Sequence, residues 1–428
     1  MIGKNESGIL SPLRRACARL VLIELWVVGG IVSASIIFPR LLPAAVLTAA
    51  FFWPLRRWAN GRWSVRTPGD FAIVLLLVMA TVSGWITPLP QTTHPQIYRL
   101  LSGIALYYTI VNTGNTRLKL HRLLWIFSLG GLAVALLAPL SVDWPLGKLP
   151  FIPDAFYQRF SVLVADPAHP NVIAGTLAIL LPVTLAGLLF GWQELKGGER
   201  AIGLLCVASM SAVLLLSLSR GAWIAISLAG LTLVVLRWRQ GWIAVVLGLL
   251  AAALGISWFG LQRALEALVA SKTVGSLTGR LEVWGRATDM ILDFPFTGIG
   301  MGAFQPLADQ LYPLLLFEPG EVFHAHNLFL QVAIDLGIPG LLAWLWILAV
   351  VILNAGKAYL AGRAAQDPLL SALGAGLLCS QLALILHGLT DAVTWGMVRP
   401  APIVWALWGA AIAAALQLNQ PQTKSFSK

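Results

Sequence analysis

Charge is scarce in this sequence of 428 residues. Asp, Glu, Lys and Arg make up 11% of it, against about 25% in an ordinary soluble domain, whereas apolar residues make up 58%. This composition excludes a soluble globular enzyme and a disordered protein, because both expose far more charge to water.

Cysteine is also rare. Of the three cysteines, Cys17 precedes the first apolar run, and Cys206 and Cys379 lie inside later runs. Because no pair of cysteines falls in a segment expected outside the membrane, we expect no disulfide.

Several motifs of soluble enzymes are missing as well. The chain has no Asp-x-Asp, no Walker phosphate loop and no Gly-x-Ser-x-Gly. The glycines at positions 298, 300 and 302 have the wrong spacing for a dinucleotide fingerprint, and no strand is expected before them. These absences disfavour nucleotide cofactors and a metal held by paired carboxylates.

Long apolar runs dominate what is present. They lie near residues 20–38, 41–55, 71–87, 97–112, 123–140, 172–190, 201–219, 221–236, 241–259, 328–354, 371–387 and 400–417. In lipid each run must be helical, since only a helix satisfies the backbone groups within one segment. The sequence therefore predicts an all-α polytopic integral membrane protein, with about 12 transmembrane helices in a single membrane domain over residues 1–428. We interpret the first run as an uncleaved span, not a signal peptide.

The excess of basic residues orients the spans. The net charge is +11, and most basic residues lie in short segments between alternate runs, for example around residues 14–19, 56–66 and 237–239. By the positive-inside rule these segments are cytoplasmic, so we expect both termini in the cytoplasm. Because topology explains the charge, we expect no nucleic-acid partner.

Two segments on the external side are long, namely 141–171 and 260–326. The second is the large extracytoplasmic loop between spans 9 and 10, and it contains one convincing amphipathic helix at 280–293. We expect Thr278 as its N-cap, Pro295 as its stop, and a glycine-rich turn at 298–302. Its expected apolar stripe is Leu281, Trp284, Ala287 and Ile291, and its expected polar face is Glu282, Arg286, Asp289 and Asp293.

External arginines are exceptions to the positive-inside rule and need a reason. Arg220 lies in SLSRGAW, a hairpin with almost no loop between two spans. Arg280 opens the amphipathic helix, where free N–H groups and a guanidinium together suit a phosphate. The alternatives are an arginine that snorkels to the headgroups and a solvated loop arginine. For Arg286, a solvated pair with its acidic neighbours is favoured.

Two histidines, His324 and His326, occur in HAHN directly before span 10, which is expected to break near Gly337. One of them can serve as a general base, because the pKa of a free histidine lies near neutrality. A metal pair and an interfacial histidine are the alternatives, and no third ligand has convincing spacing. Three further polar residues also lie at external ends of spans, where a structural role is favoured for each taken alone: His169, Asn171 and Asp391.

The motifs SLSRGAW, GRLEVWGRATDMILDFPFTGIGMGAF and HAHNLFLQVAIDLGIPG, in this order, resemble the O-antigen ligase and polymerase family over about residues 214–345. DPAHPN at 166–171 is similar to a further element of that family. The resemblance implies a glycosyltransferase of the bacterial cytoplasmic (inner) membrane. Such an enzyme moves a glycan from undecaprenyl pyrophosphate to lipid A-core or a similar acceptor, with inversion and without metal or cofactor.

Residue by residue, Arg220 and Arg280 match the family's arginines that engage the pyrophosphate. His326, directly before Asn327, matches the histidine that acts as a base or orients the acceptor. The implied partners are the lipid-linked glycan donor, a glycan or lipid A-core acceptor, and the bilayer. We therefore expect Arg220, Arg280 and His326 to lie close together, with His324, Asn327, Arg286, His169, Asn171 and Asp391 as secondary candidates.

Other functions remain open at this point. An O-antigen or exopolysaccharide polymerase and a protein glycosyltransferase fit the same motifs, and the ligase is favoured by twelve spans with one large late loop. A small-anion transporter, for example of bicarbonate, requires ionisable residues in mid-span and broken helices repeated in both halves. A flippase requires a polar cavity through the bundle, which the apolar runs offer little to line.

Overall fold

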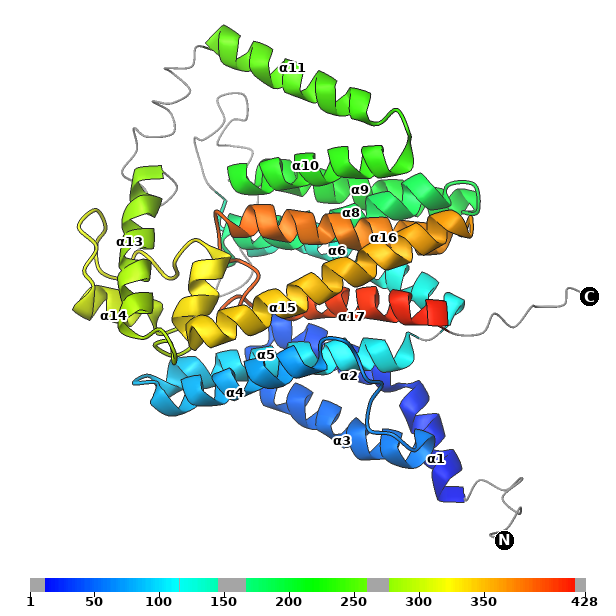
Figure 1. Cartoon of the computed structure of the whole chain (residues 1–428), viewed down its shortest axis with the longest axis horizontal. Helices are drawn as coiled ribbons and strands as arrows, with labels where there is room; N and C mark the ends of the chain where they lie inside the picture. Colours follow the sequence, from blue (N-terminus) through cyan, green and yellow to red (C-terminus); the bar gives the residue numbers. More distant parts are fainter. Residues whose placement is uncertain (1–11, 115, 145–166, 260–276, 420–428) are drawn as a thin grey trace, which may run out of the picture.

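The structure is a computed structural model that describes residues 12–114, 116–144, 167–259 and 277–419. Within these residues the fold is all-helical and contains no strand, which confirms the predicted class. Most of the helices lie roughly side by side, and α13 and α14 stand at one end of the bundle (Figure 1). The helices are α1 (Pro12–Leu22), α2 (Glu24–Ile37), α3 (Leu42–Asn60), α4 (Asp70–Ile86), α5 (Pro90–Thr113), α6 (Arg117–Ser141), α8 (Pro170–Gly191), α9 (Gly197–Leu216), α10 (Arg220–Arg237), α11 (Trp242–Phe259), α13 (Leu277–Asp293), α14 (Phe304–Leu311), α15 (Leu328–Ala364), α16 (Pro368–Gly388) and α17 (Pro402–Leu416).

Each of the twelve apolar runs lies on a helix, but the helices differ in length. Six helices, namely α6, α8, α9, α10, α15 and α16, are long and apolar enough to cross a membrane. The pair α1 and α2, bent by 44°, adds a seventh if it is one broken span. Helices α4 and α17 are apolar but have 17 and 15 residues, below the about 20 that a typical bilayer core requires. The structure supports a multi-pass membrane protein, and twelve crossings stay a prediction.

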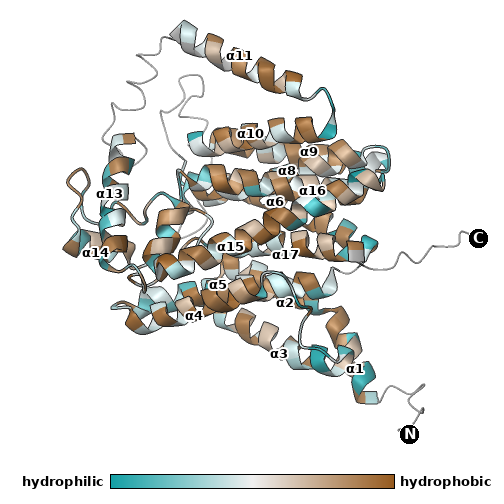
Figure 2. Ribbon diagram, viewed as in Figure 1, coloured by the Kyte–Doolittle hydropathy of each residue, from teal (hydrophilic) through white to brown (hydrophobic). Residues whose placement is uncertain are grey.

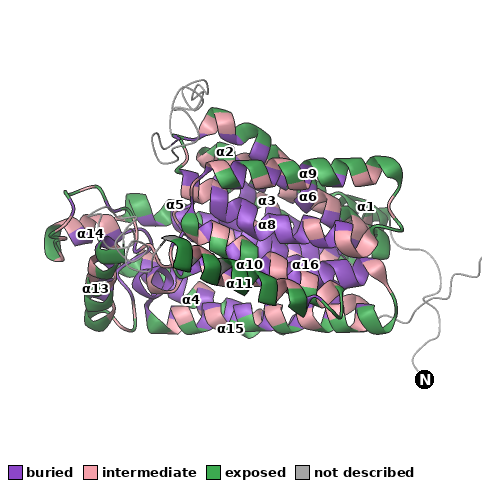
Figure 3. Ribbon diagram, turned by 90° about the horizontal axis from the view of Figure 1, so that it is seen from above, coloured by how far each residue is buried: buried purple, intermediate pink, exposed green. Residues whose placement is uncertain are grey.

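The centre of the bundle is formed by α8 and α16, the most buried of the six candidate spans (Figure 3). Small residues let these helices approach closely, as is common between helices in lipid. A Cβ on Gly376 of α16 would lie 2.8 Å from the Cα of Val183 in α8, so any larger residue would push the two helices apart. Other helices, which are rich in apolar residues (Figure 2), also expose large apolar side chains, and these suit contact with lipid tails.

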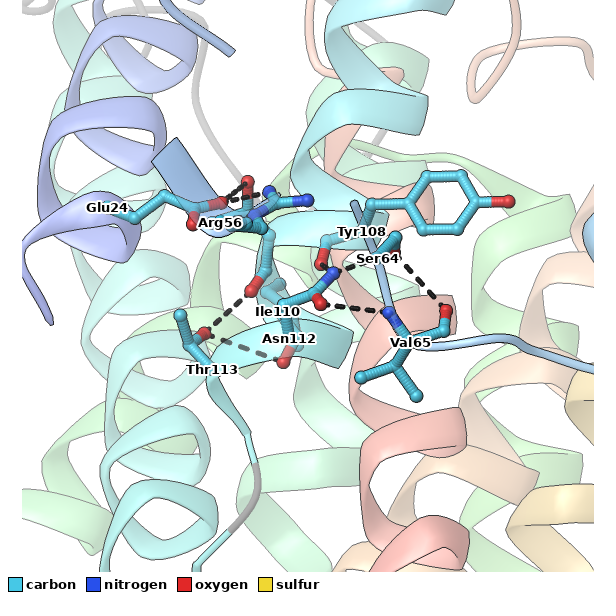
Figure 4. A network of polar contacts seen from close by, with 9 residues as sticks. Glu24, Arg56, Ser64, Val65, Tyr108, Ile110, Asn112 and Thr113 are labelled. Carbon is cyan, nitrogen blue, oxygen red and sulfur yellow. Dashed lines mark hydrogen bonds and ion pairs between the residues drawn. The ribbon is translucent and has the colours of Figure 1, made fainter. Parts of the chain in front are cut away.

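The N-terminal helices are joined by a buried ion pair (Figure 4). Arg56 of α3 donates from Nε to Glu24 of α2 at 2.8 Å, and both side chains are at most 1% exposed. Thr109 of α5 donates a further hydrogen bond of 2.9 Å to Glu24. Arg56, which the sequence placed in a cytoplasmic segment, is therefore buried in an ion pair. A buried guanidinium must be paired, and its partner lies on a different apolar run.

The predicted amphipathic helix of the external segment is α13, which begins at Leu277 and ends at Asp293. Thr278 therefore lies inside the helix and is not its N-cap, whereas the helix does end before Pro295 as predicted. Two expectations for its faces are wrong. The buried stripe is Gly279, Val283, Ala287 and Met290, while Leu281 is 56% exposed. Glu282 does not face away, because its carboxylate accepts hydrogen bonds from the backbone N–H groups of residues 315 and 316.

The glycine-rich turn after α13 docks on α15. Gly298 has φ +68°, and a Cβ there would lie 2.5 Å from the carbonyl oxygen of Ile334, so only glycine fits. The neighbouring Ile299 donates its N–H to the same carbonyl at 2.8 Å. Helix α15 kinks at Gly337 (φ +71°), which confirms the predicted break, and the turn packs against this kink. The glycine-rich turn of the external segment is thus fixed to α15.

One end of the bundle collects the chain segments that carry the candidate residues. In Figure 1, α13 and α14 lie at the left end, while the start of α1 and the end of α17 lie at the right. The first residues of α8, α10 and α15 and the last residues of α16 are at the same end as α13.

Candidate active site

Asp391 is the centre of the candidate site. It follows α16 directly, and its side chain is 2% exposed. Its Oδ1 atom lies 3.4 Å from Nδ1 of His326 and 3.6 Å from Nε2 of His324. Its Oδ2 atom accepts a hydrogen bond of 2.7 Å from Nδ2 of Asn171, at the start of α8. The side chains of His324, His326 and Asn171 therefore meet at the carboxylate of Asp391.

The HAHN segment is held in an unusual conformation. His326 has φ +46°, a left-handed conformation that costs a non-glycine residue roughly 1–3 kcal/mol. Its N–H donates to Nδ1 of His324 at 3.1 Å, and the two rings lie 4.1 Å apart. Asn327 caps α15 with its Oδ1 and donates from Nδ2 to the carbonyl of Leu389 at 3.2 Å. This last bond ties the histidine loop to the segment of Asp391.

Burial and neighbouring charges determine the protonation states of His324 and Asp391. Burial lowers the pKa of His324 to about 3, helped by His326 and His169 and opposed by Asp391, so His324 is neutral at neutral pH. Burial acts to raise the pKa of Asp391, but its contact with His326 and the nearby histidines bring the pKa well below its usual range. The cluster therefore combines an ionised carboxylate with a neutral imidazole.

Arg280 of α13 lies near this cluster. Burial lowers the pKa of its guanidinium, and the charge of Arg220 lowers this pKa further, whereas the charge of Asp391 raises it. The charges of Arg220 and Asp391 therefore both act on Arg280. Its Nε atom is buried and has no hydrogen-bond partner among the residues that the structure describes. A buried N–H donor beside a second guanidinium is suited to an anion.

The glycine that follows Arg220 lets the first turn of α10 lie against the segment that precedes Asp391. Arg220 is the first residue of α10, four residues after α9 ends, which confirms the predicted short hairpin. A Cβ on Gly221 would lie 2.3 Å from Oγ1 of Thr390 and 3.3 Å from Cδ2 of His387. The first turn of α10 therefore packs directly on the residues that precede Asp391, and a larger side chain would displace it.

Two of the secondary candidates lie at the edge of the site. His169 is exposed and caps α8, accepting the N–H of Asn171 at 3.2 Å, and its charge contributes to the lowered pKa of His324. Arg286 pairs with Asp289 at 3.4 Å on a half-exposed face of α13, as the sequence predicted. His169 thus borders the cluster, whereas the contacts of Arg286 are with its own helix.

Sequence reasoning missed His387. Its side chain, at the end of α16, is 3% exposed and lies between α8 and α10, where a Cβ on Gly175 would come within 2.9 Å of the ring. Its carbonyl accepts the N–H of Asp391 at 2.9 Å. The available signal was the spacing of four residues between His387 and Asp391, about one helical turn, but His387 was hidden at the end of an apolar run.

The cluster also has the donor atoms of a metal site. One atom each from His324, His326 and Asp391 lie within 4.8 Å of one another. The expectation that no third ligand accompanies the two histidines is therefore wrong, because Asp391 comes from a distant part of the chain. The positive charges of Arg220 and Arg280 oppose a divalent cation here and favour an anion.

Comparison with known proteins supports the resemblance. Residues 205–345 match the family model described as O-antigen ligase, and this segment contains Arg220, Arg280 and His326. Asp391 and Asn171 lie outside the matched residues. No curated protein matches the chain. The match confirms the predicted resemblance to this family over residues 205–345 and does not favour a small-anion transporter.

Proposed function

Because residues 205–345 belong to the O-antigen ligase family, we propose that this protein is a lipid-linked glycan transferase of the ligase type. It transfers a glycan from undecaprenyl pyrophosphate to lipid A-core or a similar acceptor at the outer face of the bacterial cytoplasmic membrane. One observation carries the proposal: Asp391 contacts His326, and its charge, like that of Arg220, acts on the guanidinium of Arg280.

The proposed topology has twelve crossings with both termini in the cytoplasm. It is supported by a helix in every apolar run and by basic segments between alternate runs. The site lies at the opposite end of the bundle from the start of α1 and the end of α17 (Figure 1). Residues 260–326 then lie on the outer face, where a lipid-linked donor presents its glycan.

The two arginines bind the leaving group. Undecaprenyl pyrophosphate gains negative charge as the bond between the sugar C1 and the phosphate oxygen breaks. Guanidinium groups fixed beside that oxygen stabilise the charge without a metal ion. The unpartnered Nε atom of Arg280 supplies a buried donor for a phosphate oxygen.

His326 is the proposed general base. With Nδ1 turned to Asp391 at 3.4 Å, its Nε2 atom remains for the acceptor hydroxyl. The hydroxyl oxygen attacks C1 as the pyrophosphate departs, and its proton passes to His326, whose positive charge Asp391 stabilises. His324 is unsuited to this role, because its pKa is about 3 and its Nδ1 atom already accepts the N–H of His326.

The reaction proceeds as one displacement. The arginines bind the donor on one side of C1, and the acceptor held by His326 attacks from the other, so the anomeric configuration inverts. No step of this scheme requires a nucleotide or a metal ion, since guanidinium charge takes the place of a divalent cation.

Deletion of the gene in its native host tests the proposed function. Glycan attached to the lipid carrier and glycan on finished surface molecules are separated on gels, with wild type and Arg280→Ala as complementing genes. A ligase predicts that polymer accumulates on the carrier, that surface glycan disappears, and that Arg280→Ala fails to restore it.

Two other outcomes have distinct meanings. If only single repeat units reach the surface in the deletion strain, the protein is a polymerase, which is the alternative within the same family. If carrier-linked and surface glycans are both unchanged, the glycosyl-transfer proposal is contradicted.

A further inference from the structure

Asp335 is a buried carboxylate that the proposed chemistry leaves unused. It lies in α15, two residues before the kink at Gly337, and it is 1% exposed. Its Oδ2 atom accepts a hydrogen bond of 2.8 Å from Nε1 of Trp395. Its Oδ1 atom accepts from Nε2 of Gln331 at 2.9 Å and from the backbone N–H of Gly302 at 3.2 Å. The three donors come from three segments of the chain.

Two of these donors connect Asp335 to the proposed base and to its carboxylate partner. The Oε1 atom of Gln331 accepts the N–H of Ala325 at 2.8 Å, and Ala325 is the residue between the two histidines of HAHN. Trp395 follows Asp391 by four residues, in the same loop after α16.

The third donor connects Asp335 to the helix that bears Arg280. Gly302 ends the glycine-rich turn that follows α13, and a Cβ there would lie 1.8 Å from Nε2 of Gln96, so the turn is tightly enclosed. Met301 in the same turn donates its N–H to Oγ of Ser83 at 2.9 Å. The turn is thus fixed on both sides, and Asp335 adds a side-chain contact with α15 to the backbone bond from Ile299 to Ile334.

We infer that Asp335 is a positioning residue, which holds the segments of His326, Asp391 and Arg280 in register for glycosyl transfer. The inference rests on the proposed function, but its geometric part does not depend on the identity of the substrate. His326 has a positive φ, a conformation that persists only when its surroundings impose it, and the bond from Ala325 to Gln331 is one such constraint.

The role requires a carboxylate. All three partners of Asp335 are N–H donors, so both of its oxygens must accept. An asparagine would turn an amide N–H₂ toward at least one of these donors and leave that donor buried and unsatisfied. Asp335→Asn is therefore expected to release at least one of the three segments.

A matched pair of tryptophans tests the inference. Trp395 donates to Asp335, and Trp408 donates from Nε1 to Oε1 of Gln381, also at 2.8 Å. Both tryptophans are at most 3% exposed. Trp395→Phe and Trp408→Phe each remove one buried N–H donor, but only the first removes a bond to Asp335.

The activity assay uses the full chain in lipid vesicles, with the total lipid extract of the deletion strain as the source of unreacted donor and acceptor. We expect Trp395→Phe to lower kcat about tenfold and Asp335→Asn about 100-fold, with KM for the donor nearly unchanged, because small displacements of catalytic groups slow chemistry more than binding. Trp408→Phe should leave both constants unchanged. An equal change of kcat in the two tryptophan variants, whatever the change in KM, would overturn the inference.

Hydrogen–deuterium exchange gives a readout that needs no activity. In Trp395→Phe, the peptides that contain His326 and Asp391 should exchange faster than in wild type, and in Trp408→Phe they should not. If wild-type vesicles transfer no glycan, the proposed function fails, while the exchange result still decides the positioning role. Equal exchange in the two tryptophan variants would contradict it.

Discussion

The Nδ1 atom of His326 lies 3.4 Å from the Oδ1 atom of Asp391, although α15 and α16 separate the two residues in the chain. This contact orients the imidazole, and it brings the histidine loop to the turn after α16 on which the first turn of α10 packs at Gly221. The proposed mechanism depends on this contact, because it joins the base to the side of the site that binds the pyrophosphate.

The two histidines of HAHN should differ in their effect on catalysis. We expect His326→Gln to lower kcat about 10²- to 10⁴-fold, the usual contribution of a general base. His324→Gln should cost much less, because His324 is neutral and takes no proton in the scheme. Steady-state rates of glycan transfer by the purified variants check this. An inactive His324→Gln beside an active His326→Gln would reverse the two roles.

The stability of the protein should fall in acid because of His324. Its pKa is about 3 in the folded protein and about 6.5 in the unfolded chain, so between these values the unfolded state binds more protons. The free energy of unfolding therefore decreases as the pH falls through this window, by at most about 1.4 kcal/mol per pH unit for one group. Asp391, whose pKa is also lowered, acts in the same direction below about pH 4.

Thermal unfolding in detergent across this pH range measures the effect. His324→Gln removes the group that titrates in the upper part of the window, so its unfolding temperature should depend less on pH there than that of wild type. Parallel curves for the two proteins would show that burial of His324 does not control the acid sensitivity.

Gly221 should be required for the position of Arg220. Gly221→Ala places a Cβ 2.3 Å from Oγ1 of Thr390, so the first turn of α10 must shift, and we expect about a 100-fold loss of transfer rate. Gly230→Ala in the same helix is the control, because a Cβ there meets nothing within 4 Å. Thr390→Ala, combined with Gly221→Ala, should restore part of the rate. Equal activity of the two alanine variants would contradict this account.

Removal of metal ions should leave the transfer rate unchanged. Arg220 and Arg280 supply the positive charge at the leaving group, so the scheme has no step for a divalent cation. The rate of wild-type protein in vesicles is measured with and without excess chelator. If the chelator abolishes transfer and zinc restores it, then His324, His326 and Asp391 form a metal site and the proposed base is wrong.

The sequence predicted the helices, because apolar runs and turn glycines are local signals. Arg220, Arg280 and His326 were found by their place at the ends of spans and by their resemblance to the family. The contact of His326 with Asp391 was not predictable, since it joins segments that lie far apart in the chain. Asp391 was therefore favoured as structural when it was taken alone.

The errors have a common physical cause. The expected stripe on α13 was partly wrong, because an apolar side chain need not face the core: Ala287 is buried, but Leu281 is exposed. Polar residues inside apolar runs were likewise undervalued. The ion pair of Arg56 was not predicted because its partner Glu24 lies on another run, and His387 escaped notice at the end of α16.

The most direct test compares two arginines of α13 in one assay of glycan transfer. The purified full chain in vesicles receives the lipid extract of the deletion strain, and the rate is measured for wild type, Arg280→Ala and Arg286→Ala. The account predicts a loss of about 10²- to 10³-fold for Arg280→Ala, whose guanidinium stabilises the leaving pyrophosphate. It predicts a nearly normal rate for Arg286→Ala, whose partner is Asp289 on the same helix. Equal rates for the two variants would contradict the proposed pyrophosphate site.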